Sequence, residues 1–261
     1  MKDAFAVTDR VVAITGGSGQ LGRSFTAALV GRGARVAVLD LQPPQEKSGD
    51  VLFVRADVTS RDSLESALAE VEKKWGVPHA LINNAALDSP PGSPAAENGP
   101  FEDFPLDSWE RAIDVNLTGA FLTCQVFGGA MAGAGRGSIV NVSSIYGVVS
   151  PDQRIYEYRR GGDDTFFKPV AYSASKSGLL NLTRYLATYW AARGVRVNTL
   201  TLGGVFNNQD PRFLDGYCAR VPLGRMADAG EYVGPVVFLC SDASSYMTGS
   251  NLVVDGGWTA W

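Results

Sequence analysis

Hydrophobic residues follow two alternating patterns along the chain. Short apolar runs rich in Val, Ile and Leu, bounded by Gly or polar residues, predict strands buried on both faces of a parallel sheet: Val11–Thr15, Arg35–Asp40, Val51–Arg55, Ala80–Asn83, Ser138–Val142, Val195–Leu200 and Asn251–Val254. Longer segments with apolar residues at helical spacing lie between them: Leu21–Arg32, Ser63–Trp75, Leu106–Ala132, Ala171–Arg193 and Asp228–Cys240. This alternation predicts a single doubly wound α/β domain over residues 1–261, with a parallel sheet of about seven strands and helices on both faces.

Two long stretches interrupt this rhythm. The proline-rich segment 88–104 follows the fourth predicted strand, and the segment 150–167 follows the fifth. Both leave the carboxyl ends of strands, the edge at which doubly wound sheets bind ligands. Loops longer than about 12–15 residues are usually functional or disordered. We therefore expect two insertions at the substrate edge. A mobile surface loop is the alternative for 88–104, and a solvated charged loop is the alternative for 150–167.

Composition excludes several classes of function. The formal net charge is -4 and no polybasic run occurs, so neither nucleic acid nor an anionic membrane is an expected partner. The single histidine, His79, excludes a multi-histidine metal site, and we expect no metal. Three widely spaced cysteines indicate a reducing, cytoplasmic setting. The first residues do not resemble a secretory signal, and no apolar run approaches the ~18 residues that span a bilayer.

A glycine-rich turn joins the first predicted strand to the first helix. Glycines there allow backbone N–H groups and the helix N-terminus to approach a pyrophosphate. Asp40 ends the second strand, 18 residues beyond Gly22, where an acid can hydrogen-bond an adenosine ribose. Because its carboxylate repels a 2′-phosphate and neither Gly19 nor Leu41 offers a cation, we expect NAD rather than NADP. The residues predicted to bind the dinucleotide here are Gly16, Ser18, Gly19, Gln20, Leu21, Gly22, Asp40 and Leu41. Those at the next two strand ends are Asp57, Val58, Asn84, Ala85 and Ala86.

The candidate reacting groups lie farther along the chain. Tyr172 and Lys176 share one face of a predicted helix, where an ammonium and an oxidised nicotinamide would favour the phenolate. Tyr172 is then a general acid/base for an alcohol–carbonyl pair, although an ordinary helix-surface Tyr and Lys is the alternative. Ser144 ends a buried strand and can donate to a substrate oxygen. Asn116 lies inside a long helix, where it either bonds its own backbone or holds a water beside Lys176.

These ordered motifs resemble the short-chain dehydrogenase/reductase family. They are the Thr15–Gly22 turn, Asn83-Asn84-Ala85, Asn116, Ser143-Ser144, Tyr172-x-x-x-Lys176, Arg196-Val-Asn198, Pro222-Leu-Gly-Arg225, Phe238-Leu-Cys-Ser-Asp242, Tyr246-Met-Thr-Gly249 and Val254-Asp-Gly-Gly257. The resemblance implies a Rossmann-type fold and a catalytic tetrad of Asn116, Ser144, Tyr172 and Lys176. In it Tyr172 exchanges the proton, Ser144 orients the reacting oxygen, Lys176 binds the nicotinamide ribose and lowers the phenol pKa, and Asn116 supports a relay water. Tyr172 and Lys176 thus also count among the cofactor-binding residues, and the resemblance adds Gly203, Val205 and Asn207.

Departures from the family pattern are concentrated near the ligands. Gln20 replaces a glycine of the nucleotide turn, Ala86 replaces another glycine, and Asn207 stands where a threonine often contacts the carboxamide. Ser144 and Tyr172 are 28 residues apart, whereas relatives usually have roughly a dozen residues between them. We expect the extra residues to form a lid whose arginines bind an anionic group of the substrate. The residues predicted to contact substrate are Tyr146, Arg154, Arg159 and Arg160.

Together these features predict an NAD(H)-dependent oxidoreductase that transfers hydride between nicotinamide and a secondary alcohol or ketone. The chain is similar to a branch associated with bacterial surface-sugar and nonulosonate biosynthesis, which points to a sugar, sugar acid or sugar nucleotide as the small-molecule substrate. The alternatives are an acyl-chain 3-ketoreductase, disfavoured by Asp40, and a catalytically silent nucleotide-binding regulator on the same fold. The resemblance also implies a homo-oligomer, either a dimer or a tetramer.

Overall fold

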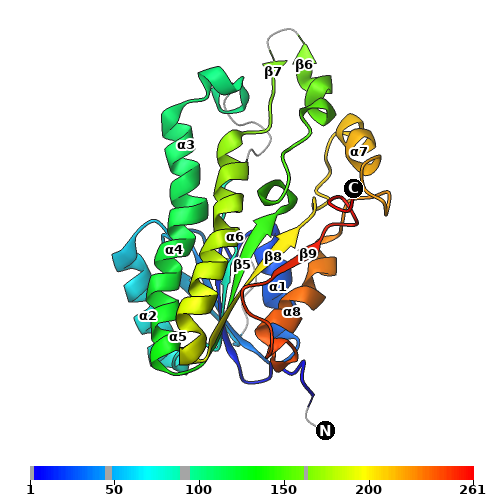
Figure 1. The fold of residues 1–261 in the computed structure, drawn as a ribbon. Helices are drawn as coiled ribbons and strands as arrows, with labels where there is room; N and C mark the ends of the chain where they lie inside the picture. The colour runs from blue at the N-terminus through cyan, green and yellow to red at the C-terminus, as the bar shows by residue number, and fades with distance from the viewer. Residues whose placement is uncertain (1–2, 45–48, 89–94, 162–163) are drawn as a thin grey trace.

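A seven-stranded parallel sheet forms the centre of the molecule, with strand order β3-β2-β1-β4-β5-β8-β9 (Figure 1). The computed structural model describes residues 3–44, 49–88, 95–161 and 164–261. The strands are β1 (Val11–Thr15), β2 (Arg35–Asp40), β3 (Val51–Arg55), β4 (Ala80–Asn83), β5 (Gly137–Ser144), β8 (Val195–Leu202) and β9 (Asn251–Val254). Each strand matches a predicted run, and only β5 and β8 extend beyond their predicted ends. The doubly wound α/β fold is therefore confirmed.

Helices cover both faces of the sheet. The helices are α1 (Gln20–Val30), α2 (Arg61–Trp75), α3 (Leu106–Ile113), α4 (Gly119–Thr123), α5 (Gly129–Gly133), α6 (Val170–Trp190), α7 (Pro211–Cys218) and α8 (Val233–Cys240). α1 and α8 contact each other on one face, whereas α2, α4 and α6 pack on the other. α3, α4 and α5 form one continuous rod, because the two segments between them, Asp114–Thr118 and Cys124–Gly128, are π-helical rather than interrupted. The sequence predicts the rod but not its π-helical turns.

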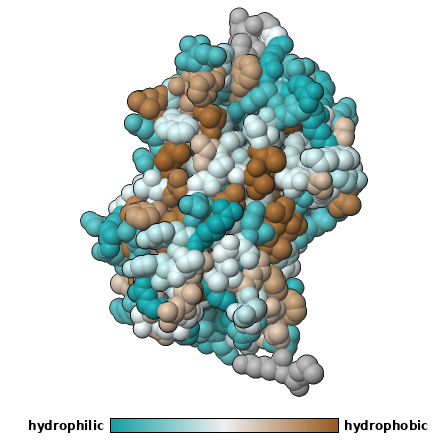
Figure 2. All heavy atoms as spheres, viewed as in Figure 1, coloured by the Kyte–Doolittle hydropathy of each residue, from teal (hydrophilic) through white to brown (hydrophobic). Residues whose placement is uncertain are grey.

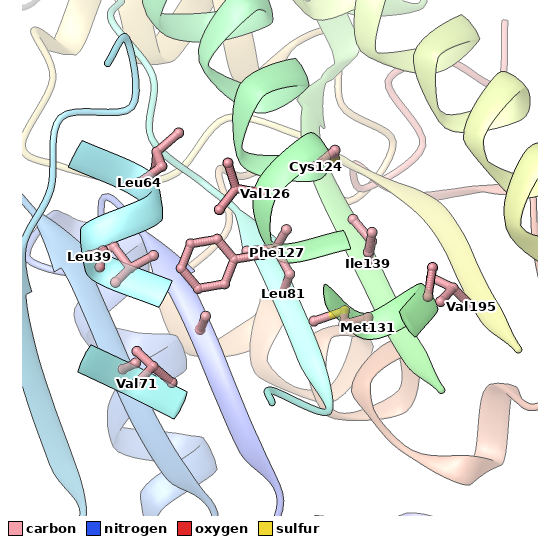
Figure 3. Packing of buried hydrophobic residues seen from close by; sticks show 14 of the residues in the cluster. Leu39, Leu64, Val71, Leu81, Cys124, Val126, Phe127, Met131, Ile139 and Val195 are labelled. Atoms are coloured by element: carbon pink, nitrogen blue, oxygen red, sulfur yellow. The ribbon is translucent and has the colours of Figure 1, made fainter. Parts of the chain in front are cut away.

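Two hydrophobic layers fix these helices to the sheet. On the α2/α4/α6 side, Phe127 is fully buried between Leu39, Leu81 and Ile139 of three strands and the helical residue Leu64 (Figure 3). Burial of one such side chain contributes about 1.5–3 kcal/mol to folding. A second layer around Phe25, Leu29 and Val237 holds α1 and α8 against the opposite face. The sheet is thus rigidly supported on both sides, which fixes the carboxyl ends of its strands.

The long rod Leu106–Gly133 corrects one expectation from the sequence. Its 28 residues make it long and apolar enough to cross a membrane by length and composition, although no such run was expected. Of its most apolar window, 56% is buried inside the protein, and its side chains Cys124, Phe127 and Met131 belong to the core layer described above. The apolar character of this rod is explained by its packing against the sheet.

The described residues of both predicted insertions follow the carboxyl ends of β4 and β5. In 88–104 the described residues form short 3-10 turns at Ala95–Asn98 and Phe101–Asp103; residues 89–94 lie outside the described residues. In 150–167 a 3-10 segment, Gln153–Arg159, leads into the antiparallel pair β6 (Arg160–Gly161) and β7 (Asp164–Thr165); residues 162–163 lie outside the described residues. This pair stands at the top of Figure 1. Neither the β6/β7 pair nor the neighbouring helix α7 was predicted.

Candidate active site

The turn between β1 and α1 is shaped for close approach of a ligand. A Cβ on Gly22 would overlap the carbonyl oxygen of Gly16 and lie 2.6 Å from Cα of Gly17. Gly16 has φ +62°, and a Cβ there would lie 2.8 Å from Cα of Ala85. Gly19 caps α1 without any side-chain hydrogen bond, and the first turn of α1 holds no acidic residue. The helix N-terminus is therefore available to a pyrophosphate, and the turn fits the dinucleotide that the sequence predicts.

Asp40 lies beside this turn at the end of β2. Its Oδ2 accepts a hydrogen bond from the backbone N–H of Ser18 at 3.0 Å, and its Oδ1 accepts from that of Gln42 at 3.1 Å. The exposed side chain of Leu41 follows it. A cation also reaches the turn, because Nη1 of Arg23 donates to the carbonyl oxygen of Ser18 at 2.8 Å. The sequence reasoning considered only Gly19 and Leu41 as sources of positive charge and missed Arg23, which is one helical turn farther along α1.

The residues that follow β3 and β4 make close contacts with other parts of the protein at the carboxyl edge of the sheet. Asn84 donates from Nδ2 to the carbonyl oxygens of Thr15 and Gly16, and its backbone N–H donates to Oγ1 of Thr15, as does that of Ala85. Ala86 follows directly in the chain. Asp57 accepts from the N–H and hydroxyl of Thr59, while Val58 is buried against Gly119. The Asn84 side chain therefore shapes the nucleotide turn and is already engaged with protein.

The loop after β8 reaches the start of α1. Gly203 lies where a Cβ would be 2.9 Å from Cα of Asp255, and Val205 pairs with Ala227 in an isolated bridge. Asn207 is exposed, and its backbone N–H donates to Gln209. Gln20, the departure from the family's glycine, donates from Nε2 to the carbonyl oxygen of Phe206 at 3.0 Å. This hydrogen bond, which the sequence did not reveal, links the start of α1 to the loop that bears Asn207.

The predicted proton-transfer groups come together where β5 ends against α6. Tyr172 lies in the first turn of α6, and Ser144 is the last residue of β5. Burial raises the pKa of Tyr172, the Asp88 carboxylate raises it further, and a hydrogen bond with Ser144 lowers it. The sequence predicts that the Lys176 ammonium and an oxidised nicotinamide together favour the phenolate, and this stays a prediction. Among the protein's own groups, burial has the largest effect on the pKa of Tyr172.

Lys176 lies one helical turn beyond Tyr172 and is buried. Its Nζ donates to the backbone carbonyl of Val142 at 2.9 Å and lies 5.8 Å from the centre of the Tyr172 ring. Desolvation lowers the pKa of Lys176 to about 8, and the Asp88 carboxylate raises it. Close contact between β5 and α6 sets this geometry: Ser143 Oγ donates to the carbonyl of Lys176 at 2.9 Å. The i,i+4 pair therefore points into the protein, which rules out an ordinary helix-surface Tyr and Lys.

Asn116 occupies the π-helical turn of the long rod and is buried. Its Oδ1 accepts from the backbone N–H of Leu87 at 2.6 Å, while its Nδ2 donates to the carbonyl of Leu87 at 2.9 Å and to Oγ of Ser175 at 3.0 Å. The Ser175 hydroxyl donates in turn to the carbonyl oxygen of Tyr172. Asn116 thus connects the start of the first insertion to the turn that bears Tyr172. A relay water held by Asn116 stays a prediction.

Comparison with known proteins finds relatives that match nearly the whole chain. The model of the family described as enoyl-(acyl carrier protein) reductase matches residues 18–259. A D-threitol dehydrogenase from Mycolicibacterium smegmatis is 32% identical over 98% of this chain and 95% of the relative. A short-chain dehydrogenase from Leptospira borgpetersenii with bound NAD+ shares 35% identity and a TM-score of 0.88, covering 99% of this chain and 96% of that one. A gluconate 5-dehydrogenase from Burkholderia cenocepacia, in complex with NADP and tartrate, shares 26% identity and a TM-score of 0.85, covering 99% and 98%.

The chain belongs to the short-chain dehydrogenase/reductase family. Members of this family are oxidoreductases that work with a nicotinamide cofactor, and the protein is such an enzyme, acting on CH–OH groups. The class of reaction predicted from the sequence is therefore confirmed, whereas the narrower surface-sugar branch is not shown.

A cluster rich in aromatic side chains packs against Tyr172. It consists of the buried side chains Ile145, Tyr146, Ile155, Tyr156, Phe166, Tyr217, Val221, Met226 and Trp258. Trp258 stacks on Tyr217 with ring centres 4.6 Å apart and meets Tyr146 edge to face at 6.4 Å. The hydroxyl groups of Tyr146 and Tyr156 are 3.1 Å apart. The described part of the 150–167 insertion therefore packs onto α7 and the C-terminal residues, and the hydroxyl of Tyr146 already has a protein partner.

The three arginines predicted to contact substrate have different surroundings. Arg160, which is half-buried, donates to the carbonyl oxygens of Phe166 and Gln153 and lies over the Phe167 ring. Arg159 lies 4.0 Å from the centre of the Phe166 ring. Arg154 is exposed and pairs with Asp152, a carboxylate that also pairs with Arg220, two residues beyond the end of α7. The Arg160 guanidinium thus donates to backbone carbonyls of the insertion itself. A role for these arginines toward substrate stays a prediction.

A further charged pair lies beside the catalytic tyrosine. Lys168, the residue directly after the second insertion, forms an ion pair with Asp88, at the start of the first. Its Nζ is 4.8 Å from the centre of the Tyr172 ring. In the sequence Lys168 is one more base of a charged insertion, and Asp88 merely begins the proline-rich segment. Nothing in their spacing, 80 residues apart, identifies them as neighbours.

Proposed function

We propose that the protein is an NAD(H)-dependent dehydrogenase that interconverts a secondary alcohol of a small polyol or related sugar derivative with the corresponding ketone. The observation that carries this proposal is the position of Tyr172 in the first turn of α6, where Ser144 ends β5 and the Nζ of buried Lys176 lies 5.8 Å from the centre of the Tyr172 ring. Polyol and sugar-acid relatives, a threitol dehydrogenase and a gluconate 5-dehydrogenase, support the substrate class. The more specific link to surface-sugar and nonulosonate biosynthesis stays a prediction.

In this mechanism Tyr172 takes the proton of the substrate hydroxyl during oxidation and returns it during reduction. Ser144 Oγ donates a hydrogen bond to the reacting oxygen as negative charge develops on it. Lys176 keeps an ammonium near the phenol and offers it to ribose hydroxyls, while Asn116 positions the turn that bears Tyr172. When bound, the nicotinamide supplies the hydride acceptor or donor. The buried surroundings exclude water from these groups and strengthen each electrostatic contact.

We propose NAD rather than NADP as the physiological cofactor. The Asp40 carboxylate at the ribose end of the groove repels a 2′-phosphate, and two backbone N–H groups fix its position. The relative from Leptospira borgpetersenii binds NAD+, whereas the gluconate 5-dehydrogenase binds NADP. Arg23 offers the opposing charge, which makes the choice between the cofactors depend on the balance of Asp40 and Arg23.

An acyl-chain reductase is the second candidate, since the matching family model carries that description. Asp40 and the packed aromatic cluster over the substrate edge favour the small polar substrate.

For the assembly we propose a homo-oligomer, because α6 exposes the stacked pair Tyr185 and Tyr189, and Phe121 of α4 is also exposed. Figure 2 shows hydrophobic side chains scattered among polar ones over the face on which α4 and α6 lie. We place the enzyme in the cytoplasm.

The decisive test is Tyr172→Phe. We expect it to lower kcat for NAD+ reduction with a polyol by about 10³-fold, because it removes the proton acceptor. NADH binding, followed by fluorescence, is expected to stay within about twofold, since the ring and its packing remain. Tyr246→Phe, on an exposed side chain, is the matched control and should keep full activity. Full activity of Tyr172→Phe would overturn the mechanism. A wild-type protein that binds NADH but oxidises no secondary alcohol would favour the silent nucleotide-binding regulator.

A further inference from the structure

We propose that Asp88 and Lys168 act together as a substrate-recognition pair that hydrogen-bonds two neighbouring hydroxyl groups of a neutral polyol and discriminates against a sugar acid. This inference rests on the proposed function and assigns its specificity to one pair of residues. It concerns side chains contributed by the two insertions, not by the sheet.

The pair lies within reach of a substrate held at Tyr172. The ammonium of Lys168 is 4.8 Å from the centre of the Tyr172 ring and 6.0 Å from that of Tyr146. The Lys168 side chain is only 9% exposed, whereas that of Asp88 is 49% exposed. The Asp88 carboxylate also acts on the reacting groups, because it raises the pKa of both Tyr172 and Lys176. A substrate whose alcohol meets Tyr172 therefore presents its neighbouring carbon atoms to this pair.

Both partners are attached to backbone that is held in place. Gln153 accepts a hydrogen bond from the N–H of Lys168 at 2.9 Å and donates to its carbonyl at 3.1 Å. Asn116 makes the same two-bond contact with Leu87, the residue before Asp88. The backbone of Lys168 is thus held by the half-buried amide of Gln153. The backbone of the residue before Asp88 is held by the buried amide of Asn116. Such fixed groups bind without paying a large ordering cost.

The chemistry of the pair matches a vicinal diol better than a carboxylate. An ammonium has three donors and a carboxylate about four acceptor positions, so an ion pair uses only part of the hydrogen-bonding capacity of each group. A hydroxyl both donates and accepts; one can accept from Lys168 while its neighbour donates to Asp88. A substrate carboxylate can only accept, and it would face the negative charge of Asp88 while Lys168 is already neutralised. The pair therefore selects by repulsion as well as by attraction.

The test compares a polyol with the aldonate of the same chain length, threitol against threonate, by kcat/KM for NAD+ reduction. The wild-type enzyme should prefer threitol. Asp88→Asn keeps the shape but frees the charge of Lys168, so the threonate-to-threitol ratio should rise by about 10- to 100-fold, the range expected for a hydrogen bond to a charged group. Lys168→Met should lower kcat/KM for threitol by about tenfold, mainly through KM, and leave threonate weaker still. Glu65→Gln, which removes the acid of the surface pair with Arg61, is the control and should leave the ratio unchanged.

The possible outcomes separate this inference from the proposed function. If the wild-type enzyme oxidises both compounds but prefers threonate, or if Asp88→Asn leaves the ratio unchanged, the recognition pair is overturned and the dehydrogenase proposal stands. If the wild-type enzyme oxidises secondary alcohols but neither compound, the polyol assignment and the pair both fail. Circular dichroism checks folding of each variant. Should Asp88→Asn not fold, the wild-type preference and Lys168→Met decide the matter alone.

Discussion

Two parts of the carboxyl edge are built in different ways. We call the part around Gly16–Gly22, where the cofactor is expected, the cofactor half, and the part around the aromatic cluster, where the substrate is expected, the substrate half. On the cofactor half the geometry is set by backbone: Gly16 and Gly22 permit a contact that any side chain would block. On the substrate half it is set by side chains, because Tyr156, Tyr217 and Trp258 pack the insertion against α7 and the C-terminal residues. A backbone-built site tolerates little change, whereas a site built by packed side chains can alter its specificity without disturbing the sheet.

Among the variants that test this difference, Gly22→Ala is expected to have the largest effect on stability and on NADH binding. The added Cβ would overlap the Gly16 carbonyl oxygen, so the turn must shift. We expect the free energy of unfolding to fall by about 3 kcal/mol and NADH binding, measured by fluorescence titration, to weaken by about 100-fold. Gly234→Ala, in α8 with open space around its Cβ, should fold at least as well as the wild type. Normal NADH binding by Gly22→Ala would show that the turn is not backbone-limited.

Lys176, where the two halves meet, should make stability depend on pH. Its pKa in the folded protein is lowered to about 8 by burial, so the unfolded chain binds more protons between pH 8 and its ordinary value of about 10.4. The cost of burying the ammonium is therefore fully present below pH 8 and is relieved as pH rises toward 10. Relative to Lys176→Met, the free energy of unfolding of the wild type should rise by about 2 kcal/mol from pH 7 to pH 10. Urea titrations at each pH would measure it, and a constant difference would contradict the buried-ammonium interpretation.

A smaller effect concerns the charges at the ribose end of the cofactor half. Asp40→Ala removes the carboxylate that opposes a 2′-phosphate and leaves Arg23 near the turn. We expect kcat/KM for NADP+ to rise by about tenfold relative to NAD+. Adding Arg23→Gln should cancel most of that gain, because the remaining cation is lost. An equal rise in the double variant would show that Arg23 plays no part.

The smallest effects distinguish two arginines of the substrate half. Arg160→Ala removes hydrogen bonds to the carbonyls of Phe166 and Gln153, and should lower the free energy of unfolding by about 1 kcal/mol. Because Gln153 also holds Lys168, KM should rise as well. Arg154→Ala, on an exposed side chain, should leave the melting temperature unchanged. A selective rise in KM for an anionic substrate in Arg154→Ala would instead support the anion-binding lid expected from the sequence.

The two halves also differ in how far the sequence predicts them. The strands, the Gly16–Gly22 turn and the shared helical face of Tyr172 and Lys176 follow from local patterns, since burial and helical spacing act over a few residues. That Ser144 meets this pair was implied by the resemblance to the family. The partners of Arg160, the π-helical turn at Asn116 and the pairing of Asp88 with Lys168 depend on where separate segments come to rest. Such contacts are set by tertiary packing, which a local pattern does not encode. The effect of burial on the pKa of Tyr172 depends on the same tertiary packing.

The stack of Trp258 on Tyr217 has a practical consequence for handling the enzyme. It brings the last residues of the chain beside α7, at the edge where substrate is expected, whereas the first described residues contact the opposite end near Ala243 (Figure 1). A purification tag or surface linker joined after Trp261 would start next to the edge where substrate is expected. One joined before Asp3 would start at the far end of the molecule and leave that edge clear, which makes the N-terminal side the better attachment point for assays and immobilisation.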